Sequence, residues 1–265
     1  MSKGAIRVGI GGWTYAPWRG TFYPEGLRQA DEQAYATAHM GAIEINATYY
    51  RLQSEKSWVK WGEAAPAGFQ YAVKASRYCT NRRVLAEAGE SIVKFLDQGM
   101  IELGDKLGPI LWQFMETKQF DPDDFDAFLA LLPAAHKGIA LRHALEPRHE
   151  SFACAEFVAL ARKHRAAIVF ADKDKFPSIA DQTADFAYAR LQCSRESEPA
   201  GYAPGELDRW ARVARAWRDG EAPKGLNYVE GAKPGGKGRD VYIFMISGAK
   251  VRAPAAAEAL IARLR

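Results

Sequence analysis

Cysteine is scarce in this sequence. The 265 residues include three cysteines, Cys79, Cys154 and Cys193, which lie far apart and are odd in number. They match neither a disulfide framework nor the close spacing of a metal-binding motif. This usage is typical of proteins from a reducing compartment.

Long apolar runs are also missing. No stretch approaches the roughly 18 consecutive apolar residues that a membrane-spanning helix needs. The first residues lead directly into a strand pattern, without the apolar region of a signal peptide. We therefore expect a soluble, cytoplasmic protein with no membrane partner.

The common cofactor motifs are absent as well. Residues 9–12 read Gly-Ile-Gly-Gly, which is not a dinucleotide-binding fingerprint, and no helix pattern follows directly. The sequence contains no P-loop and no H-E-x-x-H zinc motif. No nucleotide cofactor is predicted.

The net charge of +4 is mild but uneven. From Arg209 onward the chain has twelve Lys or Arg residues and five Asp or Glu residues. Solvated helix faces would explain this excess, and so would a surface that binds nucleic acid. Residues 222–239, rich in glycine and lysine, are predicted to be a mobile loop insertion.

Strand and helix patterns alternate along the whole chain. This alternation predicts an α/β protein with a single (β/α)8 barrel domain over residues 1–265, irregular around the sixth and seventh strands. An open doubly wound sheet is the alternative. The predicted strands are residues 6–12, 41–51, 69–76, 109–114, 143–148, 167–172, 186–193 and 241–247. Residues 139–142 could belong to the fifth of them. The predicted helices are residues 30–40, 56–65, 83–106, 122–132, 154–164, 204–218 and 254–264. The third is expected to be broken or bent near Gly89 and Gly99, and Asp121 is the expected cap of the fourth.

The second strand carries polar residues on one face. Ile43 and Ile45 alternate with Glu44 and Asn46. Since helices are expected on both sides of this strand in the sequence, both its faces should be covered. A buried carboxylate is costly unless it is paired or has a function.

Other strands repeat this arrangement near their ends. In a parallel barrel these positions converge on the C-terminal mouth, where active sites of this fold lie. Besides Glu44 and Asn46, the set comprises Lys74, Gln113, Glu146, Arg148, Asp172 and Arg190.

Two interpretations of this set stay open. One is a ring of buried ion pairs that only closes the barrel. The other is a ligand site, which we favour because buried ion pairs stabilise proteins poorly. Arg148 and Arg190 would suit a phosphate or carboxylate, and Lys74 could act as an acid, a base or a Schiff-base amine.

Aromatic residues are expected above the same mouth. Trp13, Tyr15 and Tyr49 are candidate substrate-binding residues, because flat rings suit a sugar or a nucleobase. Packing of the loops over the barrel would explain them equally well.

A divalent metal is an alternative. His143 and His149 flank the fifth strand, and with Glu44, Glu146 and Asp172 they would form an oxygen-rich ligand set. Three basic residues at the same mouth would repel a cation, so no metal ligand is assigned.

Several segments resemble the YecE-like family, a domain of unknown function. The similar segments are residues 11–15, 18–24, 44–51, 69–74, 106–111, 146–152 and 184–191. The resemblance implies a TIM-type barrel and the same polar positions, but no reaction. The chain departs from the family at residues 244–248, which replace an asparagine-rich turn, and in the longer 222–239 segment.

Two functional hypotheses follow. The first is an enzyme for acid–base or hydrolytic chemistry on a small anionic or phosphorylated ligand. Catalytic candidates are Glu44, Lys74, Glu146 and Asp172, and binding candidates are Trp13, Tyr15, Asn46, Tyr49, Gln113, Arg148, His149 and Arg190. The second is a nucleic-acid-binding protein or a metal-dependent phosphodiesterase; oligomeric state is not predicted.

Overall fold

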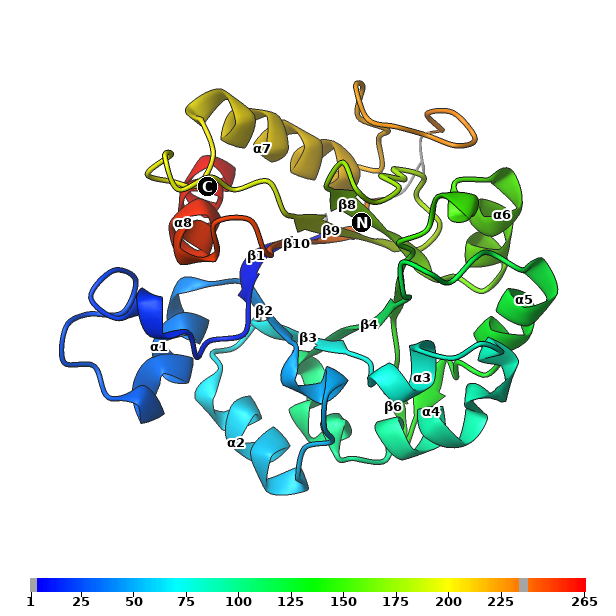
Figure 1. Cartoon of the computed structure of the whole chain (residues 1–265). Helices are drawn as coiled ribbons and strands as arrows, with labels where there is room; N and C mark the ends of the chain where they lie inside the picture. The colour runs from blue at the N-terminus through cyan, green and yellow to red at the C-terminus, as the bar shows by residue number, and fades with distance from the viewer. Residues whose placement is uncertain (1–3, 234–237) are drawn as a thin grey trace.

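The computed structural model describes residues 4–233 and 238–265. Eight parallel strands form a closed barrel in the order β1-β10-β9-β8-β7-β4-β3-β2. Figure 1 shows the strands as a central ring with the helices outside it. The predicted α/β barrel is therefore confirmed, and the open sheet is wrong.

The barrel strands are short, and most of their residues are buried. Apolar side chains on both faces explain this burial, because each strand contacts the barrel interior on one side and helices on the other. Their bounds are β1 Ile6–Gly11, β2 Ala42–Ile45, β3 Gln70–Lys74, β4 Leu107–Gln113, β7 His143–Glu146, β8 Ala167–Asp172, β9 Phe186–Leu191 and β10 Asp240–Met245.

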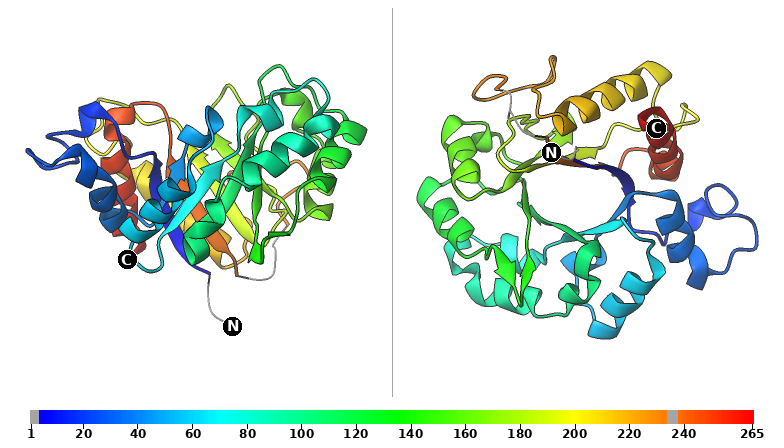
Figure 2. Two further views of the ribbon diagram at one scale, coloured as in Figure 1. Left: turned by 90° about the horizontal axis from the view of Figure 1, so that it is seen from below. Right: turned by 180° about the vertical axis from the view of Figure 1, so that it is seen from behind.

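Helices cover the outside of the barrel, and the views from below and behind in Figure 2 show the same outer layer. The predicted cap is confirmed, because the Asp121 side chain accepts hydrogen bonds from the backbone N–H groups of Asp123 and Asp124. The helices are α1 Glu32–His39, α2 Glu55–Ala64, α3 Arg77–Thr80, α4 Gly89–Leu96, α5 Pro122–Ala130, α6 Ala155–Lys163, α7 Pro204–Arg218 and α8 Ala253–Leu264.

Strand alternation divides the core in two. The outer part lies between strands and helices and includes Ile43 and Ile45. A smaller inner cluster fills the barrel with Ala42, Tyr188, Phe244 and neighbouring side chains. The rings of Tyr188 and Phe244 are 5.1 Å apart between centroids, so side chains fill the barrel interior.

One possibility left open by the sequence is wrong, and one expected break is confirmed. Ile139–Ala140 (β6) is not part of the fifth barrel strand but pairs antiparallel with Ala135–His136 (β5). The break expected near Gly89 and Gly99 in residues 83–106 is confirmed, because α4 begins at Gly89 and lies between the 3-10 helices η4 Leu85–Ala88 and η5 Met100–Lys106. Gly99, at φ 96°, ends the helical path because left-handed backbone interrupts an α-helix.

The sixth unit lacks a helix, since residues 173–185 between β8 and β9 contain none. This irregularity was expected. Asp181 instead accepts hydrogen bonds from the backbone N–H groups of Val229 and Glu230, which anchors part of the 222–239 segment. Residues 234–237 of that segment lie outside the described residues, and its mobility stays a prediction.

A helix that spans a bilayer must be both long and apolar. None of the helices that the structure describes meets both conditions.

Candidate active site at the barrel mouth

Arg190 is the centre of a buried charge cluster. Its Nη1 donates to both carboxylate oxygens of Glu146 at 2.7 Å, and its Nη2 donates to Glu44 Oε1 at 3.0 Å. Both carboxylates are fully buried, and the arginine side chain is 3% exposed. Strands β2, β7 and β9 bring these residues together because each places an inward side chain near its C-terminal end.

Neutral groups complete the shell of the two carboxylates. Tyr188 donates its hydroxyl to Glu44 Oε2 at 2.7 Å, and Asn46 Nδ2 donates to Glu44 Oε1 at 3.0 Å. Gln113 Nε2 donates to Glu146 Oε2 at 2.5 Å. The Arg190 Nε atom, however, is buried without a hydrogen-bond partner in the described part of the chain.

The pairing keeps Glu146 and Arg190 ionised. Burial by itself would raise the pKa of Glu146, but Arg190 and Arg148 hold the pKa below its usual value. Burial opposes the charge of Arg190 too, but Glu146 and Glu44 raise the pKa of its guanidinium. Glu146 and Arg190 therefore form a permanent ion pair over the usual pH range.

Lys74 lies at the end of β3 and is not part of the ion-pair network. Its ammonium makes no hydrogen bond or ion pair with any described residue, and it lies 4.2 Å from the ring centroid of Tyr49. Burial and the positive charge of Arg190 lower the pKa of Lys74 to about 8, although Glu44 and Glu146 oppose the shift. The amine can therefore gain or lose a proton near neutral pH.

Arg148 is the second cation with free capacity. Its Nη2 lies 3.6 Å from Glu146 Oε1, and its side chain is 22% exposed. The guanidinium lies 4.6 Å from the ring centroid of Phe176, while Nε is buried without a partner among the described residues. Arg148 can therefore donate to a ligand without breaking a short ion pair.

Asp172 does not join this cluster, which corrects the expected ring of six charges. Along β8, Ala167 and Val169 face the barrel interior, whereas Ile168 and Phe170 face the helices. Asp172 shares the outward parity. Burial raises the pKa of its carboxyl, and its charged neighbours are Arg209, Asp174 and Glu206.

The aromatic candidates mainly pack the loops around the mouth. Trp13 contacts the ring of Trp61 at 5.2 Å, and Tyr15 contacts that of Trp18 at 5.3 Å. Tyr49 differs, because Asn81 Nδ2 donates to its hydroxyl at 3.0 Å while its ring faces Lys74.

The two histidines have structural contacts. His149 caps the 3-10 helix η6 Glu150–Phe152, since its Nδ1 accepts from the backbone N–H of Ser151. His143 is buried, its Nδ1 accepts from Trp112 Nε1, and burial lowers the pKa of the ring. Within residues 4–233 and 238–265, no three His, Cys, Asp or Glu side chains are grouped so that they could hold a metal ion.

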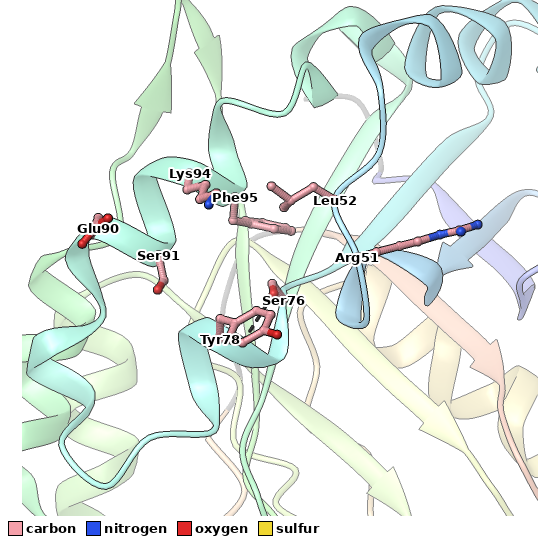
Figure 3. A pocket seen from close by; sticks show the side chains of 8 residues that line it. All are labelled: Arg51, Leu52, Ser76, Tyr78, Glu90, Ser91, Lys94 and Phe95. Atoms are coloured by element: carbon pink, nitrogen blue, oxygen red, sulfur yellow. Dashed lines mark hydrogen bonds between the residues drawn. The ribbon is translucent and has the colours of Figure 1, made fainter.

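Two pockets open among the segments that follow the first barrel strands. One of about 370 Å³, here the Phe95 pocket, has Ser91, Lys94 and Phe95 of α4 opposite Leu52, with Ser76 and Tyr78 at its lower edge (Figure 3). The other has about 280 Å³ and is lined by Trp13, Asn46, Trp61 and Lys250, among others. The second contains Asn46, which donates to Glu44, whereas no residue of the charge cluster lines the Phe95 pocket.

Sequence reasoning missed Tyr188 and Lys250. Tyr188 precedes Arg190 by two positions, so the alternation used for Arg190 also predicts that it faces inward. Lys250 lies 4.4 Å from the ring centroid of Tyr15, and burial lowers the pKa of its amine. It lies beyond the last strand, where period-two alternation carries no information.

A family model described as "Protein of unknown function DUF72" matches residues 7–265. The chain belongs to the DUF72 family. The expected membership in a family of unknown function is thereby confirmed, whereas the name YecE-like stays a resemblance. The family carries no assigned reaction for this barrel.

Known relatives support the family and the fold. The UPF0759 protein YunF of Bacillus subtilis is 27% identical over 114 residues, which cover 41% of this chain and 39% of YunF. The chain thus aligns with less than half the length of that relative. A DUF72 family protein of Thermotoga maritima has a TM-score of 0.71 at 22% identity, with 97% of each chain covered.

A similar barrel occurs outside the family. The structure of D-psicose 3-epimerase in the presence of D-fructose has a TM-score of 0.51 at 12% identity, covering 94% of this chain and 89% of the epimerase. This likeness supports the barrel fold alone.

Proposed function

We propose that this DUF72 protein is an enzyme that performs acid–base or hydrolytic chemistry on a small anionic or phosphorylated ligand. The site is the C-terminal mouth of the barrel. Lys74 is the proton-transfer group, and Arg148 binds the anion beside it. The observation that carries the proposal is the amine of Lys74, buried at the mouth, free of an ion pair within the described residues, and with a pKa of about 8.

A lysine in this state suits catalysis. Proton transfer is most effective when the pKa of the group lies near the working pH. A lysine needed only for stability would be expected to pair with one of the nearby carboxylates, yet Arg190 takes both. We infer that Arg190, Glu44 and Glu146 are positioning residues that fix the charge around Lys74.

The charge of the mouth supports an anionic ligand. Three cations, Lys74, Arg148 and Arg190, are opposed by two carboxylates. Because Arg190 already donates to both carboxylates, Arg148 and Lys74 are the better anion-binding groups. The excess of positive charge at the mouth does not suit a divalent cation. Metal analysis of the purified protein tests that alternative.

The test uses a panel of p-nitrophenyl phosphate monoesters and diesters. Lys74→Met is expected to lower turnover on an accepted ester by at least about 100-fold, the usual contribution of a proton-transfer group. The wild-type pH–rate profile should have a limb at about 8, the pKa of Lys74. In the variant this limb should be missing.

Lys60→Met is the matched control, because Lys60 is an exposed lysine of α2. It should retain wild-type turnover and the limb near pH 8. Unchanged turnover in a folded Lys74→Met variant would remove Lys74 from the mechanism.

A second candidate is binding of single-stranded nucleic acid. Tyr50 and Tyr78 lie near the mouth with 67% and 60% of their surface exposed, and the guanidinium of Arg77 lies over the ring of Tyr78. Exposed rings beside cations suit stacking on bases. This function requires binding that weakens linearly in log K against log salt, and a salt-independent signal would contradict it.

The three free cysteines support our proposal of a reducing, cytoplasmic environment. Cys193 is exposed, and a thiol in that position is prone to oxidation outside such a compartment.

A further inference from the structure

A further pocket opens near the mouth between the end of α3 and the loop after β4. It has a volume of about 590 Å³ and is here called the Arg83 pocket. Both segments follow the C-terminal ends of barrel strands, so the pocket lies on the same face as Lys74. It is lined by Thr80, Asn81, Arg82, Arg83, Met115, Thr117, Lys118, Gln119, Phe120 and Asp121.

Two of its cations are fixed in place. Arg82 Nε donates to the carbonyl of Tyr78 at 2.7 Å, and its Nη2 donates to Ser91 Oγ at 2.6 Å. Lys118 Nζ donates to the carbonyl of Arg83 and to Asp124, both at 2.7 Å. These bonds organise the wall before any ligand arrives, which reduces the entropy lost on binding.

Two other groups lack partners within the described residues. Arg83 lines the pocket, and its guanidinium makes no ion pair or hydrogen bond with a described residue. The hydroxyl of Thr80, a residue that is 1% exposed, is buried without a hydrogen-bond partner. A buried hydroxyl in that condition is costly, and a ligand oxygen would satisfy it.

The balance of charge favours an anion. Arg82, Arg83 and Lys118 are opposed in the lining by Asp121, whose carboxylate caps α5. Lys118 is further compensated by Asp124, which leaves Arg82 and Arg83 to attract a ligand. A guanidinium beside a hydroxyl suits the oxygens of a phosphoryl group.

The pocket is connected to the proposed catalytic lysine. Asn81, in its lining, donates to the hydroxyl of Tyr49, and the ring of Tyr49 faces the ammonium of Lys74. The side chains of Asn81 and Tyr49 therefore link the Arg83 pocket to the mouth.

We propose that the Arg83 pocket binds a second phosphoryl group of the ligand that reacts at Lys74. The inference rests on the proposed function and deepens it, because the substrate class becomes a small molecule with two anionic groups. One group lies against Lys74 and Arg148, and the other lies against Arg83 and Thr80.

The test is an amide NMR titration of the isotope-labelled full chain with inorganic phosphate. Wild-type protein should show two independent sets of shifts, one around residues 80–83 and one around residues 74–76. Arg83→Met should weaken phosphate binding at the first set about tenfold, the loss of one charge-assisted contact. Lys74→Met should weaken only the second set.

A hexose bisphosphate then tests whether one ligand spans both places. It should move both sets of shifts together and bind at least about tenfold more tightly than the hexose monophosphate, because the second contact is intramolecular. Equal affinities would overturn the spanning ligand.

Arg212→Met is the control, because Arg212 is an exposed arginine of α7 with no role in either site. It should bind phosphate like the wild type. If Arg83→Met retains both sets of shifts, the pocket is not an anion site. If instead only Lys74→Met has no effect, the proposed function fails while the Arg83 pocket stands.

Discussion

Individual buried charges at the mouth differ in what balances them. Glu44 and Glu146 share one arginine, and all three are almost fully shielded from water. Lys74 has only the face of Tyr49 and the distant pull of the carboxylates. The paired charges of Arg190, Glu44 and Glu146 fix the geometry of the mouth, whereas the ammonium of Lys74 is available for a ligand.

Replacing Glu146 tests the pairing. Glu146→Gln leaves Arg190 with one carboxylate, and an incompletely compensated buried charge costs about 3 kcal/mol of unfolding free energy. The pKa of Glu146 is held below its usual value near 4.5. Its contribution is therefore complete above pH 4.5 and is lost as the pH falls through the folded-state pKa. Urea unfolding at several pH values measures both effects.

Asp172→Asn is the matched control for that experiment. Burial raises the pKa of Asp172, so its ionised form is disfavoured in the folded state. The neutral amide should leave stability at pH 7 unchanged or slightly higher. A loss equal to that of Glu146→Gln would contradict the outward placement of Asp172.

At the scale of elements, the ends of strands and helices decide where functional groups lie. Glu44, Lys74, Gln113, Glu146 and Arg190 all stand in the last two positions of their strands. The loops that follow are held by local bonds, such as the cap of α5 and the contact of Asp124 with the backbone N–H of Ala86. The same bonds shape the Arg83 pocket.

Removing the cap of α5 should weaken this region. Asp121→Ala is expected to cost about 1 kcal/mol, because two backbone N–H groups lose their acceptor. Asp123→Ala, in the first turn, should cost at most about 0.5 kcal/mol through the helix dipole. Thermal unfolding compares them, and equal losses would show that the side-chain cap adds nothing.

For the whole molecule, closure of the barrel depends on close backbone contact between β1 and β2. A Cβ atom added to Gly9 would lie 1.8 Å from the carbonyl oxygen of Ala42. No side-chain rotation relieves a clash with backbone. The pairing of β1 with β2 therefore requires glycine at position 9.

Gly9→Ala should destabilise the barrel by at least about 3 kcal/mol, at the upper end of overpacking effects. Gly205→Ala is the control, because an added Cβ there meets nothing within 4 Å in α7. It should stabilise the protein by about 0.5 kcal/mol through higher helix propensity. A soluble Gly9→Ala protein with wild-type unfolding free energy would contradict the close contact.

The sequence by itself determined the barrel, most helix positions and the residues at the mouth. Alternation on β2 indicated that Glu44 shares a face with Asn46, and Asp121 marked the start of α5. These features are local, since they depend on the period of a strand or the capping of a helix. Gly89 and Gly99 likewise indicated the breaks within residues 83–106, because glycine weakens a helix interior.

Only the tertiary structure decided which charges pair. The β8 segment, Ala167–Asp172, is apolar up to its last residue, so its sequence does not indicate which face is inward, and Asp172 was assigned to the wrong side. The sharing of Arg190 between Glu44 and Glu146, and the isolation of Lys74, depend on contacts between strands far apart in the chain. The sequence identifies the candidate charged residues. Their ion-pair partners depend on the closed barrel, because it fixes which strand ends meet.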